Sequence, residues 1–268
     1  MTTVASLRAP QALQELNARF EAAHPTEILR WALEESGLDR VAIASAFQAE
    51  GTAVIHMAVC MRPDIPVLFL QTGFHFAETL AFKERLSEML HLNVVELTGD
   101  YTVDSQSQAF GPRLYERDPR QCCEINKVIP WRRALLDLDG WITSMRRDSA
   151  WTRSDTPIIS REHMGFGHSV VKINPVANWS RQDVWNYIGD HDLPKNPLYD
   201  LGYKSIGCAP CTRMTLPGED ERAGRWAGSE RTECGMHQRE LGNTPRKPDA
   251  TEGRASDEVA LPQYGQQR

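Results

Sequence analysis

The sequence predicts a single-domain α/β fold built on one doubly wound, mostly parallel sheet. Short, nearly all-apolar segments recur along the chain, as expected for strands that are buried on both faces of a parallel sheet. Residues 41–47 and 66–70 are such segments, and residues 93–97, 141–144 and 169–173 are expected to form three further strands. Segments with helical spacing alternate with them, and this alternation predicts a doubly wound sheet with ligands at the carboxyl ends of its strands. With 268 residues, of which 41% are hydrophobic, the chain can bury one sizeable core.

The helices are predicted from apolar spacing and from the residues that start or end them. Residues 10–37 are expected to form two helices, because Pro25 starts the second one and Gly37 ends it. Ser180 and Asp183 form a capping box, which predicts a short helix that ends near residue 190. Further helices are predicted at residues 52–60, 74–90 and 123–138.

The net charge, the apolar runs, the first ten residues and the cysteine count indicate which classes of protein are expected. The net charge of −6 gives no overall positive field, so neither nucleic acid nor an anionic membrane is expected as a partner. No apolar run approaches the roughly 20 residues of a membrane-spanning helix, and residues 1–10 lack the pattern of a secretory signal. Six cysteines in a chain of this length favour a reduced, cytoplasmic protein over a disulfide scaffold.

The predicted organisation is one domain with extensions at both ends. We expect a helical segment at residues 1–25 and the α/β domain at residues 26–217. Residues 218–240 are expected to form a mobile segment that carries a reactive cysteine. Residues 241–268 are polar and rich in proline, glycine and charge, which predicts a disordered tail.

Four of the six cysteines lie in two short segments, as the adjacent pair Cys122-Cys123 and as Cys208 and Cys211 of a Cys-x-x-Cys sequence. Ligation of a metal or cluster needs several thiolates that converge on one point. Neighbouring side chains on a helix diverge by about 100°, so an adjacent pair suits a large centre such as an iron–sulfur cubane better than one zinc ion. Taken alone, the Cys-x-x-Cys also fits a redox dithiol or a zinc half-site, and the adjacent pair fits two small buried apolar residues.

A fifth cysteine, Cys234, lies in the sequence Glu-Cys-Gly-Met-His at residues 233–237. With the two cysteine pairs, this segment makes residues 26–240 resemble the assimilatory adenylyl-sulfate (APS) reductases of the bacterial, [4Fe-4S]-containing type. The resemblance implies a sheet of the adenine nucleotide alpha-hydrolase (PP-loop) type. It also implies one [4Fe-4S] cluster per chain, held by Cys122, Cys123, Cys208 and Cys211.

The resemblance further implies the reaction and its catalytic residues. Cys234 would attack the sulfur of adenylyl sulfate, release AMP and keep an S-sulfocysteine, from which reduced thioredoxin or a similar thiol carrier frees sulfite. His237 lies three residues after this nucleophile, and cations near a thiol lower its pKa. Lys127, one helical turn after Cys123, matches a family lysine placed between cluster and substrate.

Two strand ends are expected to bind the nucleotide. The turn at residues 45–51 is where phosphates meet backbone N–H groups and a helix N-terminus, although it holds one glycine and matches no common phosphate loop. The resemblance assigns substrate binding there and at the Leu-Gln-Thr-Gly sequence of residues 70–73. The residues it implicates are Ser45, Phe47, Gln48, Glu50, Thr72, Gly73 and His75. Gly51 and Gln71 stand where the family often has acidic residues, which leaves their roles open.

Five arginines are candidates for binding the phosphosulfate. Arg146, Arg147 and Arg153 follow the fourth predicted strand, and guanidinium groups bind phosphate and sulfate oxygens in pairs. Arg222 and Arg225 match the Arg-x-Gly-Arg-Trp segment with which family members close on the substrate.

Three alternatives remain open from the sequence. A 3′-phospho-APS (PAPS) reductase shares the nucleophile segment but lacks the two cysteine pairs. A zinc-stabilised nucleotide-binding module would use the four paired cysteines as a structural site, with Cys234 incidental. An adenylyltransferase of the ATP pyrophosphatase type would need a Ser-Gly-Gly-x-Asp-Ser-like loop, which residues 45–51 do not supply. The sequence leaves homo-oligomerisation and the identity of the thiol donor undetermined.

Overall fold

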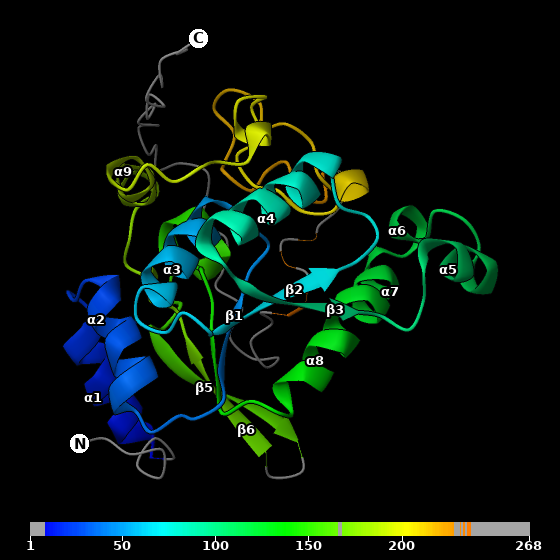
Figure 1. Cartoon of the computed structure of the whole chain (residues 1–268). Coiled ribbons are helices and arrows are strands. Elements are labelled where there is room, and N and C mark those ends of the chain that lie inside the picture. Colours follow the sequence, from blue (N-terminus) through cyan, green and yellow to red (C-terminus); the bar gives the residue numbers. More distant parts are fainter. Residues whose placement is uncertain (1–8, 166–167, 228–230, 232, 234, 237–268) are drawn as a thin grey trace.

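The computed structural model describes residues 9–165, 168–227, 231, 233, 235 and 236. Its sheet has six strands in the order β3-β2-β1-β4-β6-β5 (Figure 1). The strands are β1 (Val41–Ala44), β2 (Pro66–Gln71), β3 (Asn93–Thr98), β4 (Gly140–Ile142), β5 (Ile159–Gly165) and β6 (His168–Ile173). The predictions for residues 1–8 and for the tail at 241–268 concern residues outside the described part.

The doubly wound α/β class is confirmed. Strands β3, β2, β1, β4 and β6 pair in parallel, and β5 pairs antiparallel with β6 at one edge. Strand β5 was not predicted, because its sequence Ile-Ser-Arg-Glu-His-Met-Gly is polar and lacks the apolar run of a central strand. The strand order reverses direction at β1, whose neighbours are β2 on one side and β4 on the other.

Two hydrophobic clusters cover the two faces of the sheet. Successive side chains of a strand point to opposite faces, so Val41 and Ile43 pack on one side of β1 while Ala42 packs on the other. The larger cluster joins the sheet to the first four helices, and the smaller one holds Trp131 and Leu135 of α8. The carboxyl ends of the strands therefore lie between these two layers, where loops can cover them.

The helices follow the predicted order, with boundaries that differ by a few residues. They are α1 (Pro10–Phe20), α2 (Pro25–Arg30), α3 (Ala49–Val59), α4 (Ala77–Leu90), α5 (Val103–Phe110), α6 (Leu114–Arg117), α7 (Pro119–Cys123), α8 (Ile129–Leu135) and α9 (Arg181–Asp190). The capping box at Ser180 is confirmed, because its hydroxyl accepts from the Asp183 N–H and the Asp183 carboxylate accepts from the Ser180 N–H. Helices α5 and α6 lie in a segment that the sequence left as a loop.

The helix expected at residues 123–138 begins earlier and contains a π-helical turn. Helix α7 ends with Cys122 and Cys123, and the π-turn Glu124–Val128 joins it to α8. Pro130 explains this turn, because a proline lacks the N–H of a regular helix and its ring clashes with the carbonyl four residues earlier. One wider turn before the proline accommodates it.

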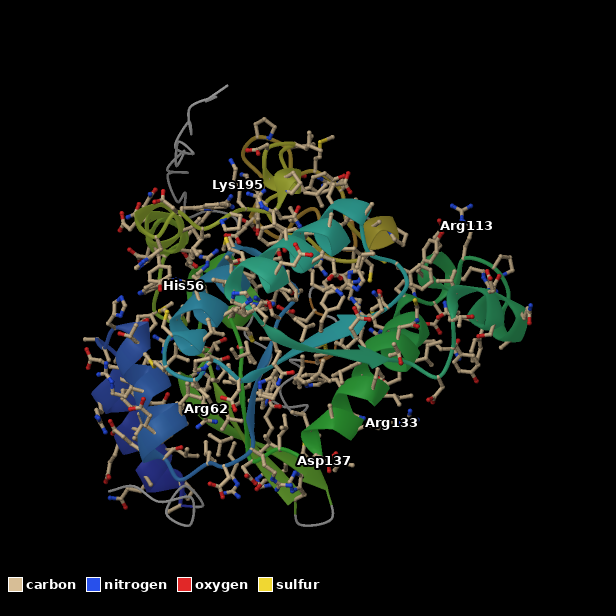
Figure 2. The ribbon with its side chains drawn as sticks, viewed as in Figure 1. His56, Arg62, Arg113, Arg133, Asp137 and Lys195 are labelled. Carbon is tan, nitrogen blue, oxygen red and sulfur yellow. The ribbon has the colours of Figure 1, made fainter. Side chains whose placement is uncertain are left out.

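The outer surface carries exposed ion pairs. Arg133 of α8 binds both carboxylate oxygens of Asp100 at 2.6 and 2.8 Å, and Figure 2 shows Arg133 and Arg113 on the outside of the molecule. In the described part of the chain, no helix is both long and apolar enough to cross a lipid bilayer.

Candidate functional site

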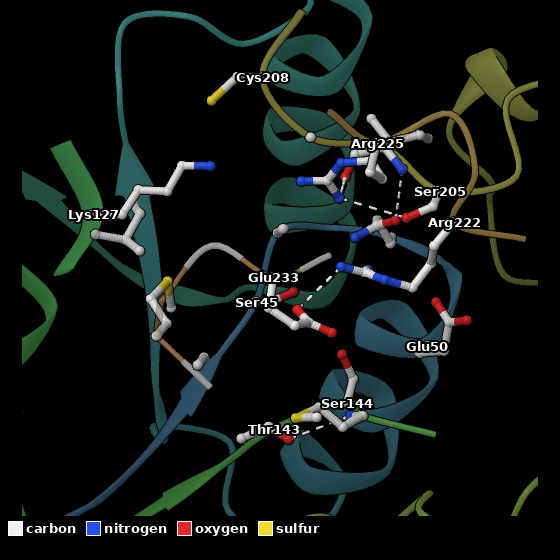
Figure 3. Close-up of a pocket in the computed structure, with 18 of the residues that line it drawn as sticks. Ser45, Glu50, Lys127, Thr143, Ser144, Ser205, Cys208, Arg222, Arg225 and Glu233 are labelled. Carbon is white, nitrogen blue, oxygen red and sulfur yellow. Dashed lines mark hydrogen bonds and ion pairs between the residues drawn. The ribbon is translucent and has the colours of Figure 1, made fainter. Parts of the chain in front are cut away.

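A cavity opens at the carboxyl ends of β1, β2 and β4, where the strand order reverses. Ligands bind at such reversals in doubly wound folds. The opposite wall consists of two loops, which we call the cysteine loop (residues 205–211) and the arginine loop (residues 222–226) (Figure 3). The predicted site residues that line the cavity are Ser45, Gln48, Glu50, Thr72, His75, Lys127, Arg146, Arg153, Cys208, Arg222 and Arg225.

The turn after β1 is shaped by contacts that local sequence did not reveal. The Ser45 hydroxyl accepts a hydrogen bond from the Phe47 N–H at 3.0 Å, and Phe47 has a left-handed backbone with φ of 53°. The Phe47 ring packs in the core, 5.6 Å from the Phe69 ring, and does not line the cavity. A Cβ at Gly51 would lie 2.6 Å from the Ser45 Oγ, so the glycine at this position leaves room for Ser45.

The segment after β2 reaches the cysteine loop. The Thr72 Oγ1 lies 3.4 Å from the Cys208 Sγ, and His75 forms an antiparallel bridge with Cys208. The His75 Nε2–H donates to the Leu70 carbonyl at 2.8 Å, and burial lowers the pKa of His75. A neutral His75 therefore fixes the end of β2. Gly73, with φ of 76°, lies outside the cavity lining.

Arg146 is fully buried and bound by three carboxylates. Its Nε donates to Glu50 at 3.0 Å, its Nη2 donates to Glu221 at 2.7 and 2.9 Å, and its Nη1 contacts Asp148. Burial by itself would lower the pKa of Arg146, because it disfavours the charged form. The three carboxylates outweigh this effect and raise the pKa. Burial also raises the pKa of Glu221, against the opposing effect of Arg146. In this structure Arg146 is thus bound to the protein's own anions, and it fixes Glu50 at the wall of the cavity.

Arg147 points away from the cavity, although it neighbours Arg146 in the sequence. Its Nε donates to the Thr156 carbonyl at 2.8 Å, and its two terminal nitrogens bind the Glu21 carboxylate. The structure therefore does not bring Arg147 together with the other predicted arginines. It joins the segment after β4 to the end of α1.

Arg153 and Arg222 converge on one carboxylate, that of Glu233. Arg153 binds it with Nε at 2.7 Å and with Nη2 at 3.0 Å. The Arg222 Nη2 binds it at 3.1 Å, and Figure 3 shows Arg222 directed toward Glu233. All three side chains are largely buried and line the cavity. Two guanidinium groups are thus held together in the cavity wall by one carboxylate.

Arg225 lies against the cysteine loop. Its Nη1 donates to the Ile206 carbonyl at 3.2 Å and approaches the Ser205 Oγ at 3.5 Å, and its guanidinium lies 4.6 Å from the centre of the Trp226 ring. The backbone of the arginine loop is tied to the same region, since the Trp226 N–H donates to the Cys211 carbonyl at 2.9 Å. The two loops therefore form one unit.

A second, smaller cavity adjoins the first and is lined by the four paired cysteines, Cys122, Cys123, Cys208 and Cys211. The two cavities share Thr72, Lys127, Cys208 and Trp226 in their walls. The Asn126 Nδ2 donates to the Cys122 carbonyl at 2.8 Å and approaches its Sγ at 3.6 Å. Lys127, on the π-turn, thus lies in the wall that separates the thiols from the larger cavity, and Figure 3 shows it near Cys208.

The four thiols that line this cavity affect one another's ionisation. Burial, followed by the charges of neighbouring cysteines, raises the pKa of Cys122 and that of Cys211 to about 11. Burial also opposes ionisation of Cys208, but Lys127, Thr72 and Arg225 together lower its pKa. Thiols that are buried together ionise more readily beside a positive charge, which a metal centre held by them would supply.

The spacing of the donor atoms bears on the kind of centre that these residues could hold. Among the described residues, no three His, Cys, Asp or Glu side chains form a group that could hold a metal ion. Zinc draws its ligands to within about 2.3 Å, whereas a cluster of several irons spreads its thiolates further apart. The four thiols line one cavity, and thiolates are the usual ligands of iron–sulfur clusters.

Two predicted catalytic residues, Cys234 and His237, lie outside the described residues. The sequence also missed residues that do line the cavity, namely Ser144, Ser205, Glu221 and Glu233. Glu233 directly precedes Cys234, so its place in the motif could have marked it. Ser205 and Glu221 carry no comparable signal.

Comparison with known families gives one match that covers most of the chain. Residues 40–214 match the phosphoadenosine phosphosulfate reductase domain. This region spans the sheet and all four paired cysteines, whereas the arginine loop and Glu233 lie beyond it.

Curated relatives and a solved structure agree with this match. The chain is 42% identical to an adenosine 5′-phosphosulfate reductase of Streptomyces coelicolor, over 88% of this chain and 100% of the relative. It is 43% identical to the reductase of the same name from Mycolicibacterium smegmatis, over 84% of this chain and 94% of the relative. The crystal structure of a phosphoadenylyl-sulfate reductase from Candida auris superposes with a TM-score of 0.65 at 26% identity, over 75% of this chain and 96% of that one.

Proposed function

This chain belongs to the phosphoadenosine phosphosulfate reductase family, and from this premise we propose that it reduces adenylyl sulfate to sulfite and AMP. It is an oxidoreductase of sulfate assimilation and cysteine biosynthesis, with reduced thioredoxin or a similar thiol carrier as donor. One observation carries the choice of substrate: the four paired cysteines line a cavity that adjoins the one at the strand ends, with Lys127 in the wall of both. PAPS reductases resemble this chain in fold but lack those cysteine pairs.

The substrate binds with its adenosine at the turn after β1 and its phosphosulfate beside the arginines. Ser45, Gln48 and Glu50 line the first part of the cavity, and Arg153, Arg222 and Arg225 line the second. The charge of Arg146 is compensated by carboxylates, so its contribution is to hold Glu50 and Glu221 in place. Displacement of Glu233 by the phosphosulfate leaves Arg153 and Arg222 free to bind the anion.

The reaction transfers a sulfonate group to a thiolate. The sulfur of Cys234 forms a bond to the sulfur of the sulfate group. The bond between the sulfate sulfur and the bridging oxygen breaks, and AMP leaves with the electron pair of that bond. One thiolate of the carrier then attacks Cys234 sulfur and expels sulfite, giving a mixed disulfide. The second carrier thiol resolves it and returns Cys234 as a thiol. The carrier becomes a disulfide, and its two electrons reduce sulfate to the level of sulfite.

The four paired cysteines are proposed to hold one [4Fe-4S] cluster, which when bound supplies electrostatic stabilisation and fixes the cysteine loop. Lys127 keeps its ammonium between these thiolates and the phosphosulfate, where it favours negative charge on both sides. The Thr72 hydroxyl orients Cys208 from β2. We place the enzyme in the cytoplasm, where thiols and such clusters stay reduced.

The test is a single-turnover assay on protein purified without oxygen, comparing wild type with Cys234→Ser. The expected result is a brown wild-type protein that releases AMP stoichiometrically from adenylyl sulfate and gains the mass of a sulfite adduct. Cys234→Ser keeps the colour and loses both signals. Faster turnover of the 3′-phosphorylated substrate would instead assign a PAPS reductase, and a colourless, zinc-loaded protein without adduct would assign the zinc-stabilised module.

A further inference from the structure

Gly207 of the cysteine loop lies directly beneath the guanidinium of Arg225. A Cβ built on Gly207 would lie 2.2 Å from the Arg225 Nη2, 2.4 Å from its Cζ and 2.8 Å from its Nε. Carbon and nitrogen atoms that are not bonded stay more than 3 Å apart, so no other amino acid fits beneath this guanidinium as it stands. Gly207 is not among the glycines with positive φ, so its backbone does not itself demand glycine.

Other contacts show that Arg225 is held in this position from several sides. The Ile206 carbonyl accepts from its Nη1 at 3.2 Å, and the guanidinium is stacked on the Trp226 ring at 4.6 Å. The Arg213 N–H donates to the Gly224 carbonyl at 2.9 Å, which ties the arginine loop to the residues after Cys211. The peptide of Gly207 therefore serves as the surface on which the guanidinium rests.

We propose that Gly207 is a positioning residue for substrate binding, because its missing side chain allows Arg225 to lie on the cysteine loop and present its charge to the cavity. This inference rests on the proposed function. Gly207 directly precedes Cys208, so the same short segment supplies one proposed cluster ligand and the support for one substrate arginine. The loop that binds the cluster thereby sets the place of a cation that binds the anionic substrate.

The choice of substitution follows from what the added atom would meet. At Gly207 a methyl group would meet the mobile end of an arginine side chain, which can move away without disturbing the backbone. At Gly224 it would lie 2.3 Å from the Arg213 carbonyl oxygen, which is part of the backbone. We therefore expect Gly207→Ala to fold and to displace only Arg225, whereas Gly224→Ala disturbs the loop itself.

The experiment is a double-mutant cycle with Gly207→Ala, Arg225→Ala and the combined variant, with AMP as the probe in calorimetry on anaerobically purified protein. We expect each single variant to weaken AMP binding by about tenfold and to raise KM for adenylyl sulfate by about tenfold, because each loses one charge-assisted contact. The combined variant should bind AMP as Arg225→Ala does, since the methyl group then has nothing left to displace. Visible absorption should stay within about twofold of wild type, because none of the variants changes a proposed cluster ligand.

Three results would overturn the inference. AMP affinity of Gly207→Ala within twofold of wild type would mean that Arg225 needs no such support. A combined variant clearly weaker than Arg225→Ala would mean that Gly207 acts through the backbone. Loss of the visible absorption in Gly207→Ala would mean that it acts on the thiol centre. Failure of wild type to bind AMP or release sulfite would instead reject the proposed function, so the two cases are distinguishable.

Discussion

Arg146 on the sheet side of the cavity and Arg222 on the loop side are both largely buried, but their partners differ. Arg146 is held by Glu50, Asp148 and Glu221 and has no exposed surface. Arg222 shares the Glu233 carboxylate with Arg153, and this carboxylate lines the cavity where an anionic ligand would bind. A cation enclosed by several carboxylates stabilises the fold, whereas a cation whose carboxylate partner lies inside the cavity can exchange that carboxylate for a ligand.

The largest expected effect is on the sheet side. Arg146→Met should lower the free energy of unfolding by about 3–5 kcal/mol, because it leaves buried carboxylates without their counter-charge. The neighbouring Arg147→Met is the matched control, and its loss should be about 1 kcal/mol or less, since its Glu21 partner is exposed. Urea unfolding of both variants measures the difference. Equal losses would contradict the view that Arg146 is a structural cation.

A smaller effect, of opposite sign, is expected on the loop side. Glu233→Gln should bind AMP about fivefold more tightly, because the neutral amide competes less well for Arg153 and Arg222 than the carboxylate does. Calorimetry with AMP measures this change.

The control for this prediction is Glu219→Gln, which removes another carboxylate bound by an arginine, Arg213, at 2.7 and 2.8 Å. Glu219 does not line the cavity, so this variant should bind AMP as wild type does. Weaker binding by Glu233→Gln would show that Glu233 organises the two arginines instead of competing for them.

The smallest effect concerns the far end of α3, the helix whose first turn carries Glu50. Burial, followed by the charge of His191, lowers the pKa of His56, which also contacts the Tyr187 hydroxyl at 2.8 Å and the Cys60 sulfur at 4.0 Å (Figure 2). The unfolded chain then binds a proton more readily than the folded one. Stability should therefore decline as the pH falls below the ordinary histidine pKa of about 6.5.

Thermal unfolding at about pH 7 and about pH 5.5 tests this prediction. The decline in Tm should be smaller in His56→Gln than in wild type, while His163→Gln removes an exposed histidine and serves as the control. AMP affinity should not change, because His56 does not line the cavity. An unchanged decline in His56→Gln would exclude His56 as the responsible group.

The central strands, their order along the chain and the cysteine pairs could be predicted from the sequence because each depends on local pattern or on a short motif. Buried parallel strands need continuous apolar runs, which residues 41–44 and 66–71 provide. Strand β5 and helices α5 and α6 escaped prediction because they are polar and lie at the periphery, where their pairing and not their composition keeps them in place.

By itself, the sequence determined the doubly wound fold, the family and the residue types available for the chemistry, since these follow from periodicity and motif. Only the tertiary structure decided that the adjacent residues Arg146 and Arg147 point to different partners, and that Lys127 lies between two cavities. It also decided that Gly207 supports Arg225. The physical reason is that the direction of a side chain depends on which distant residues offer it charge, hydrogen bonds or space, and these partners meet only in the folded chain.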